Sequence, residues 1–146
     1  MLTFHDDTVL EIEADYIVVD LPVGWRADPV AGLDRLVAER WPDARNGLLE
    51  HVRARRFDGG DICAVPPTAS RPGVIYLASC PAPDRPTMAF ISRGIRNLVG
   101  WCRRQKVLRV ALPLMTTNTS PEAVRRARDF YQEELGRVRT EYMVGL

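Results

Sequence analysis

Short apolar runs alternate with segments of helical spacing along the chain, and one junction between the two stands out. Val107–Leu114 is a nearly continuous apolar run, too short and too β-branched for a buried helix, which predicts a parallel strand ending at Pro113. Ser120 suits a helix N-cap, with Pro121 at the first helical position. This order places backbone N–H groups and the positive end of a helix dipole beside Thr116–Ser120, which suits an anion such as a pyrophosphate. A plain turn is the alternative.

The same two patterns predict the other elements. The predicted strands are Leu2–Phe4, Tyr16–Val19 ending at Asp20, Ile62–Val65, Val74–Ala78 and an edge strand within Val138–Val144, and Val9–Ile12 continues an apolar alternation. The predicted helices are Val30–Trp41 with Asp28 as N-cap, Asp43–Arg56, Met88 to about Gln105 with Thr87 as N-cap, and Pro121–Leu135. Strands alternating with helices imply an α/β domain with a mainly parallel sheet.

In such a domain, ligands bind at the carboxyl ends of the strands. Three loops that follow apolar strands therefore become candidates for a binding cleft: Asp20–Asp28, Ser79–Pro86 and Met115–Ser120. The turn at Asp6–Thr8 follows the first strand, and together the four segments can outline one cleft.

Composition narrows the classes of function. The 146 residues fit one domain, and a net charge of +1 indicates no nucleic-acid-binding tract. The basic cluster Arg103–Lys106 is better explained as a solvated helix end, so nucleic acid is not the expected partner. No apolar stretch approaches membrane-spanning length, and the first seven residues lack the regions of a signal peptide. We expect a cytoplasmic protein without membrane contact.

The three cysteines, Cys63, Cys80 and Cys102, are widely spaced and fit neither a disulfide framework nor a CxxC metal site. No metal and no cofactor are expected from this pattern. Cys80 follows an apolar strand and could serve a cysteine-based enzyme, but His5 and His51 are distant in sequence and no activating partner is evident. A buried, inert thiol is the preferred interpretation.

Several pieces of the sequence together resemble a known family. They are Asp7–Leu10 leading to Asp15–Asp20, Gly32–Val37 up to Trp41-Pro42, Gly60–Ile62 with Val74–Ala78, and Val110–Leu114. Their order and spacing resemble macro domains, the ADP-ribose-binding fold, and especially the branch related to antitoxins that remove ADP-ribose from DNA. The resemblance spans nearly the whole chain. It implies a three-layer α/β/α fold with a mainly parallel central sheet, in a single domain over residues 1–146.

The resemblance also implies a set of site residues. Asp7 or Thr8 would lie near the base, Thr116, Thr117, Asn118, Thr119 and Ser120 on the phosphates, and Asp20 near the distal ribose. Leu21, Gly24 and Ser79 complete the predicted binding residues. Asp20 is the candidate catalytic residue, where it could activate water or contact a ribose hydroxyl.

This sequence departs from the family pattern at both binding loops. Val19 or Asp20 takes the position of the family's Asn, Gly24 and Gly32 are the only glycines of the first loop, and the lysine of the DNA-acting branch is missing. Met115–Thr119 replaces the glycine-rich phosphate loop, and its side chains restrict backbone approach to a pyrophosphate. The resemblance implies binding of ADP-ribose or a related nucleotide, and whether hydrolase activity is retained stays open. The alternative is a ligand-deficient macro-like fold that acts as a protein-interaction module or binds a different small ligand.

Overall fold

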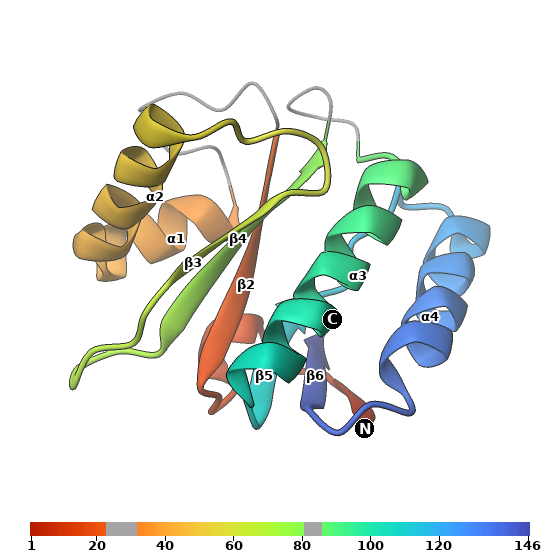
Figure 1. Ribbon diagram of the computed structural model, residues 1–146. Helices are drawn as coiled ribbons and strands as arrows, with labels where there is room; N and C mark the ends of the chain where they lie inside the picture. The colour runs from red at the N-terminus through yellow and green to blue at the C-terminus, as the bar shows by residue number, and fades with distance from the viewer. Residues whose placement is uncertain (23–31, 81–85) are drawn as a thin grey trace.

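The computed structural model describes residues 1–22, 32–80 and 86–146 (Figure 1). The strands in these ranges are β1 (Leu2–His5), β2 (Tyr16–Pro22), β3 (Ile62–Val65), β4 (Gly73–Cys80), β5 (Arg109–Pro113) and β6 (Glu141–Gly145). The helices are the 3-10 turn η1 (Val9–Glu11) and the α-helices α1 (Leu33–Arg40), α2 (Pro42–Ala54), α3 (Met88–Gln105) and α4 (Pro121–Leu135). The predicted binding residue Gly24 and the predicted N-cap Asp28 lie outside the described residues.

The six strands form one sheet in the order β1-β6-β5-β2-β4-β3. Every neighbouring pair is parallel except β3 and β4, which form an antiparallel hairpin. The prediction of a mainly parallel sheet is therefore confirmed. Because parallel strands point the same way, the carboxyl ends of β1, β6, β5, β2 and β4 all lie at one edge of the sheet, called here the carboxyl edge.

Helices cover both faces of the sheet. Figure 1 shows α1 and α2 on one side and α3 and α4 on the other. Each side has its own core: Val19 contributes to the α1/α2 core and Val18 to the α3/α4 core, as alternation along a strand requires. All eight residues of β4 are buried, as expected for a strand covered on both faces. The predicted three-layer arrangement is thus confirmed.

The last strand differs from its prediction in one respect. Val138–Val144 was expected to supply an edge strand, whereas β6 lies between β1 and β5 and pairs with both in parallel. Tyr142, Met143 and Val144 are all buried because both faces and both edges of the strand are covered. The sequence reveals a strand here, but its neighbours depend on where the chain re-enters the sheet after α4.

Three boundaries also differ from prediction. Residues 9–11 form a 3-10 turn instead of an extended segment, with the N–H of Glu11 donating to the carbonyl of Thr8 at 3.0 Å. β2 continues past Asp20, and β4 includes Ser79, which had been assigned to a loop. Pairing between β2 and β4 extends both strands beyond their apolar runs. None of the described helices is long and apolar enough to cross a membrane.

Candidate functional site

The turn after β1 and the end of β6 meet at the carboxyl edge. His5 is the register partner of Gly145, and a Cβ atom on Gly145 would lie 2.9 Å from the carbonyl oxygen of Asp7. A glycine therefore allows the turn to rest directly on β6. Asp7 and Thr8 are both exposed, and the side chain of Thr8 forms no cap hydrogen bond with η1. Their side chains are thus presented to solvent beside the end of β6.

A buried tyrosine fixes the start of the loop after β5. The hydroxyl of Tyr131, on α4, donates to the carbonyl of Pro113 at 2.7 Å and accepts from the N–H of Met115 at 2.9 Å. The tyrosine is fully buried, and burial raises its pKa, so the phenol stays neutral and fills both roles. Sequence analysis placed Tyr131 on the apolar face of its helix and missed this role. A tyrosine among aliphatic residues is a usable signal, because a buried phenol needs a polar partner.

The far end of the same loop is held by its own side chains. The Oδ1 atom of Asn118 accepts from the N–H of Ser120 at 2.8 Å, and the hydroxyl of Ser120 accepts from the N–H of Ala123 at 3.1 Å. The prediction of Ser120 as the N-cap of α4 is confirmed. Asn118 and Ser120 therefore shape the loop. Within the described ranges, no hydrogen bond occupies the backbone N–H groups of residues 116–119.

A cavity of about 430 Å³ opens between this loop and the end of β6. Thr116 and Thr119 contribute its hydroxyl groups, while Leu114, Val124 and Gly145 are among its apolar lining residues. The structure thus brings the predicted phosphate loop next to the strand end that supports Asp7 and Thr8. The cavity is predominantly apolar, and an anion here would depend on backbone N–H groups for its hydrogen bonds.

Asp20 lies on the neighbouring strand β2, between the fully buried Val19 and Leu21. Burial raises the pKa of Asp20, and the negative charge of Asp34 raises it further. The charge of Asp20 in turn contributes to the raised pKa of Tyr131. Asp20 is therefore coupled electrostatically to the tyrosine that holds the predicted phosphate loop. A carboxyl group with a raised pKa at a strand end is a candidate proton acceptor.

Asp34 belongs to a buried ion pair that the sequence pattern did not single out. Its carboxylate on α1 pairs with the guanidinium of Arg45 on α2, and their side chains are 1% and 7% exposed. Asp34 occupies the first turn of α1. The pair thus ties the two helices together directly beside the strand that carries Asp20.

Among the predicted binding residues that the structure describes, Leu21 and Ser79 differ from the rest because both are fully buried. They lie near the carboxyl ends of adjacent strands, with Leu21 paired to Ala78. The carbonyl of Ser79 accepts from the N–H of Thr87 at 3.2 Å, and its hydroxyl lies 3.3 Å from the sulfur of Cys80. Leu21 and Ser79 therefore belong to the buried interior beneath the carboxyl edge.

Cys80 is 5% exposed at the end of β4. The two histidines have other contacts: His5 is hydrogen-bonded to Thr3, and the ring of His51 packs edge-on against Phe57. Among the described residues no three His, Cys, Asp or Glu side chains are grouped so as to hold a metal ion.

Comparison with known proteins identifies the architecture. No protein-family model matches the sequence, and no curated protein matches it. Among solved structures, the macrodomain of Thermus aquaticus DarG is similar over 100% of this chain and 98% of its own, with a TM-score of 0.86 and 18% identity. The macrodomain of Mycobacterium tuberculosis DarG is similar over 100% and 98%, with a TM-score of 0.78 and 16% identity.

A third neighbour was solved with a ligand. Thermosipho africanus DarTG in complex with ADP-ribose is similar over 99% of this chain and 42% of its own, with a TM-score of 0.74 and 12% identity. At these identities the comparisons establish the fold: the chain has the architecture of a macrodomain, as its sequence pieces predicted.

Proposed function

We propose that this protein binds ADP-ribose or a related nucleotide at the carboxyl edge of its sheet. One observation carries the proposal: the N–H groups of residues 116–119 are not used by the described protein, and their loop borders a cavity of about 430 Å³. A loop between a strand and a helix N-terminus is a general site for phosphate groups. The ADP-ribose complex of the structurally similar Thermosipho africanus DarTG supports the same ligand.

In this proposal the ligand spans the edge from β1 to β2. The diphosphate lies against the loop of residues 116–120, the base lies toward Asp7 or Thr8, and the distal ribose lies toward Asp20. The raised pKa of Asp20 favours the protonated, neutral form of its carboxyl group, which reduces its repulsion of a diphosphate.

A second function is favoured by a different feature of the same cavity. Its lining is mainly apolar, and the loop carries threonine side chains in place of glycine. Apolar concave surfaces also receive protein side chains. On this alternative, the fold is a protein-interaction module or binds a different small ligand.

Calorimetric titration with ADP-ribose separates the two functions, with AMP and NAD as comparison ligands. We expect saturable, micromolar binding of ADP-ribose. Thr117→Glu should abolish it, because a carboxylate in the loop repels the diphosphate. Thr117→Gln is the matched control, since it has similar size without the charge, and it should retain binding. Absence of heat with all three ligands would contradict nucleotide binding and favour the interaction module.

A further inference from the structure

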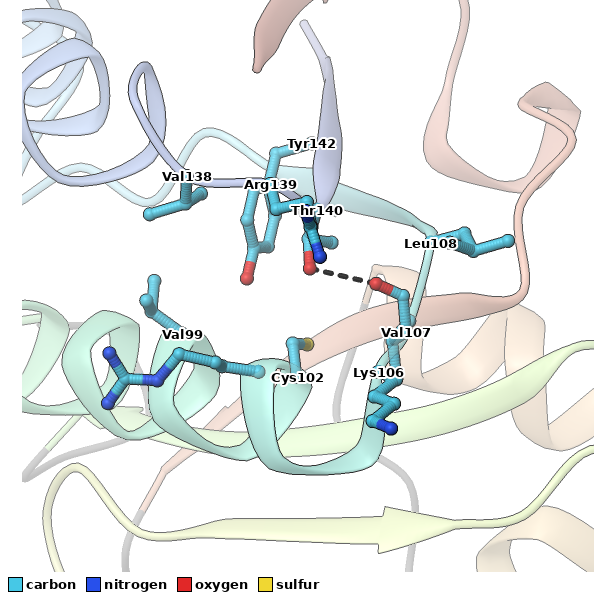
Figure 2. A pocket seen from close by; sticks show the side chains of 10 residues that line it. Val99, Cys102, Lys106, Val107, Leu108, Val138, Arg139, Thr140 and Tyr142 are labelled. Carbon is cyan, nitrogen blue, oxygen red and sulfur yellow. Dashed lines mark hydrogen bonds between the residues drawn. The ribbon is translucent and has the colours of Figure 1, made fainter.

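A second cavity lies at the opposite end of the sheet from the candidate site. Its volume is about 640 Å³, within the range of small-molecule pockets. It is enclosed by the last turns of α3, the segment that leads into β5 and the segment that leads into β6 (Figure 2). β5 begins beside this cavity and ends at the phosphate loop, so the strand separates the two sites along its length.

Valine side chains form much of the wall of this cavity. Figure 2 shows Val99 on α3 facing Val138 across the space, and Val107 also lines it. Leu108, which contributes to the lining as well, is 71% exposed, the largest exposure among the large hydrophobic residues that the structure describes. These surfaces favour an apolar body in the cavity.

One polar group is buried in this apolar setting. Tyr142 is fully buried, and no described residue meets the geometry of a hydrogen bond to its hydroxyl, although the Cys102 thiol and the Thr140 hydroxyl lie near enough to affect its pKa. Figure 2 shows that hydroxyl directed into the space between Val99 and Val138. The neighbouring Thr140 hydroxyl donates elsewhere, to the carbonyl of Val107 at 2.8 Å. Burial raises the pKa of Tyr142, so the phenol is a neutral donor at physiological pH.

The charged residues around the cavity all have the same sign. Arg103, Lys106 and Arg139 line it, and no acidic residue does so in the described part of the chain. None of the three cations forms an ion pair with a described residue. Arg103 is one helical turn from Val99, which places both on the same face of α3. Arg103 therefore extends from the same face of α3 as the Val99 side of the cavity wall.

We propose that this cavity binds a small amphipathic carboxylate. The carboxylate accepts a hydrogen bond from the Tyr142 hydroxyl and pairs with Arg103, and its apolar body lies between Val99 and Val138. The ligand gives the buried hydroxyl the acceptor that it lacks in the protein, and its charge complements the cationic rim. This proposal is independent of nucleotide binding, because the two sites share no lining residue.

The test is calorimetric titration of the whole chain with octanoate, using 1-octanol as the uncharged analogue. We expect saturable binding of octanoate at one site, weakening as salt concentration rises. Octanol should bind at least about tenfold more weakly, since it lacks the charge that strengthens the hydrogen bond. Equal affinity for the two compounds, or no binding of octanoate, would overturn the proposal.

Two variants locate the binding. Tyr142→Phe and Arg103→Gln should each weaken octanoate binding by about tenfold, as expected for loss of a charge-assisted hydrogen bond. Arg125→Gln is the matched control, because Arg125 is an exposed arginine on the neighbouring helix α4 that does not line the cavity. Unchanged octanoate affinity in Tyr142→Phe would exclude the proposed site.

The folding of Tyr142→Phe is a second readout. Removal of a buried hydroxyl without a partner should leave the melting temperature unchanged or raise it. A clear drop would mean that the hydroxyl already has a stabilising partner in the protein, which contradicts the proposal. ADP-ribose titration of the same variant should match the wild type, so failure at one site is distinguishable from failure at the other.

Discussion

The two helical layers are attached to the sheet by different chemistry. On the α1/α2 side, charged groups are buried: Asp34 pairs with Arg45, and the guanidinium of Arg71, 4% exposed, lies 2.8 Å from Asp43. On the α3/α4 side, the buried polar groups include the neutral phenols of Tyr131 and Tyr142, and the α1/α2 core also holds one buried phenol, that of Tyr76. Charged pairs become expensive when one partner is removed, whereas a phenol can be changed to phenylalanine with little change in shape.

Asp20 is coupled electrostatically to residues of both helical layers. Its pKa is raised in part by Asp34 of the charged layer, and it contributes to the raised pKa of Tyr131 in the neutral layer. The α1/α2 layer therefore influences the candidate site through the charge of Asp34, which raises the pKa of Asp20. The α3/α4 layer influences it through the hydrogen bonds of Tyr131, which hold the loop after β5. Substitutions in each layer should affect the site in different ways.

The largest effect is expected from Arg45→Met. The substitution removes the cation that pairs with Asp34 and leaves a buried carboxylate without it, which should lower the free energy of unfolding by about 3–5 kcal/mol. Urea unfolding at neutral pH measures this. Arg126→Met is the control: it breaks the exposed pair with Glu122 and should cost less than about 1 kcal/mol.

A double variant isolates the cause. Asp34→Leu combined with Arg45→Met replaces both charges with apolar groups and should recover most of the lost stability. If the double variant is as unstable as Arg45→Met alone, the loss comes from packing of the long arginine side chain instead of the removal of its charge from beside Asp34.

Tyr131→Phe should have an intermediate effect. It leaves the N–H of Met115 and the carbonyl of Pro113 without their partner, and we expect a loss of about 1–3 kcal/mol of unfolding free energy. The proposed ADP-ribose binding should weaken too, because the predicted phosphate loop loses its anchor. The identical change at Tyr142, which should lower neither quantity, is the internal comparison. Similar losses for the two tyrosines would contradict the distinction between them.

Asp20→Asn should produce the smallest change in stability, of opposite sign. Because the folded protein holds the pKa of Asp20 above its ordinary value of 3.8, the ionised carboxylate destabilises the fold at neutral pH. The variant should therefore be more stable than the wild type at pH 7, and the difference should disappear as pH falls below about 3.8. Thermal unfolding across this range measures it.

The same variant informs on chemistry at the site. Removal of the negative charge should tighten ADP-ribose binding. If the wild type releases ADP-ribose from modified DNA and Asp20→Asn does not, Asp20 acts in hydrolysis. A variant that is less stable than the wild type at pH 7 would show that the carboxylate is favourably bonded, contrary to its raised pKa.

Local signals explain which parts of the fold were predictable. The limits of α3 and α4 follow from apolar spacing together with the side chains of Thr87 and Ser120, each of which caps its helix as expected. The end of β5 at Pro113 is equally local. Strand order is different, because the position of β6 between two partners is decided by the path of the chain across the whole sheet.

The candidate site likewise combines features that follow from local sequence with features that depend on how distant segments pack. Its place at the carboxyl edge follows from parallel strands and could be predicted. The burial of Leu21 and Ser79 could not, because it results from strand pairing beyond the apolar runs. In the sequence, Asp34 and Arg45 have the pattern of ordinary surface residues of a helix. They form a pair only because α1 packs against α2. Hydroxyl partners such as those of Tyr131 likewise exist only once α4 packs on the sheet.

The position of β1 beside β6 has a consequence for the order of folding. Leu2 pairs with Tyr142, so this contact joins the two ends of the sequence described here and closes a very long loop. Contacts of such separation form slowly and require the intervening elements to be in place. On the ribosome, the first strand must wait for the last before it can dock. Since the turn at Asp7 rests on Gly145, the proposed nucleotide binding should appear only in the final stage of folding, and, if titration demonstrates it, it can serve as an assay for completion of the native sheet.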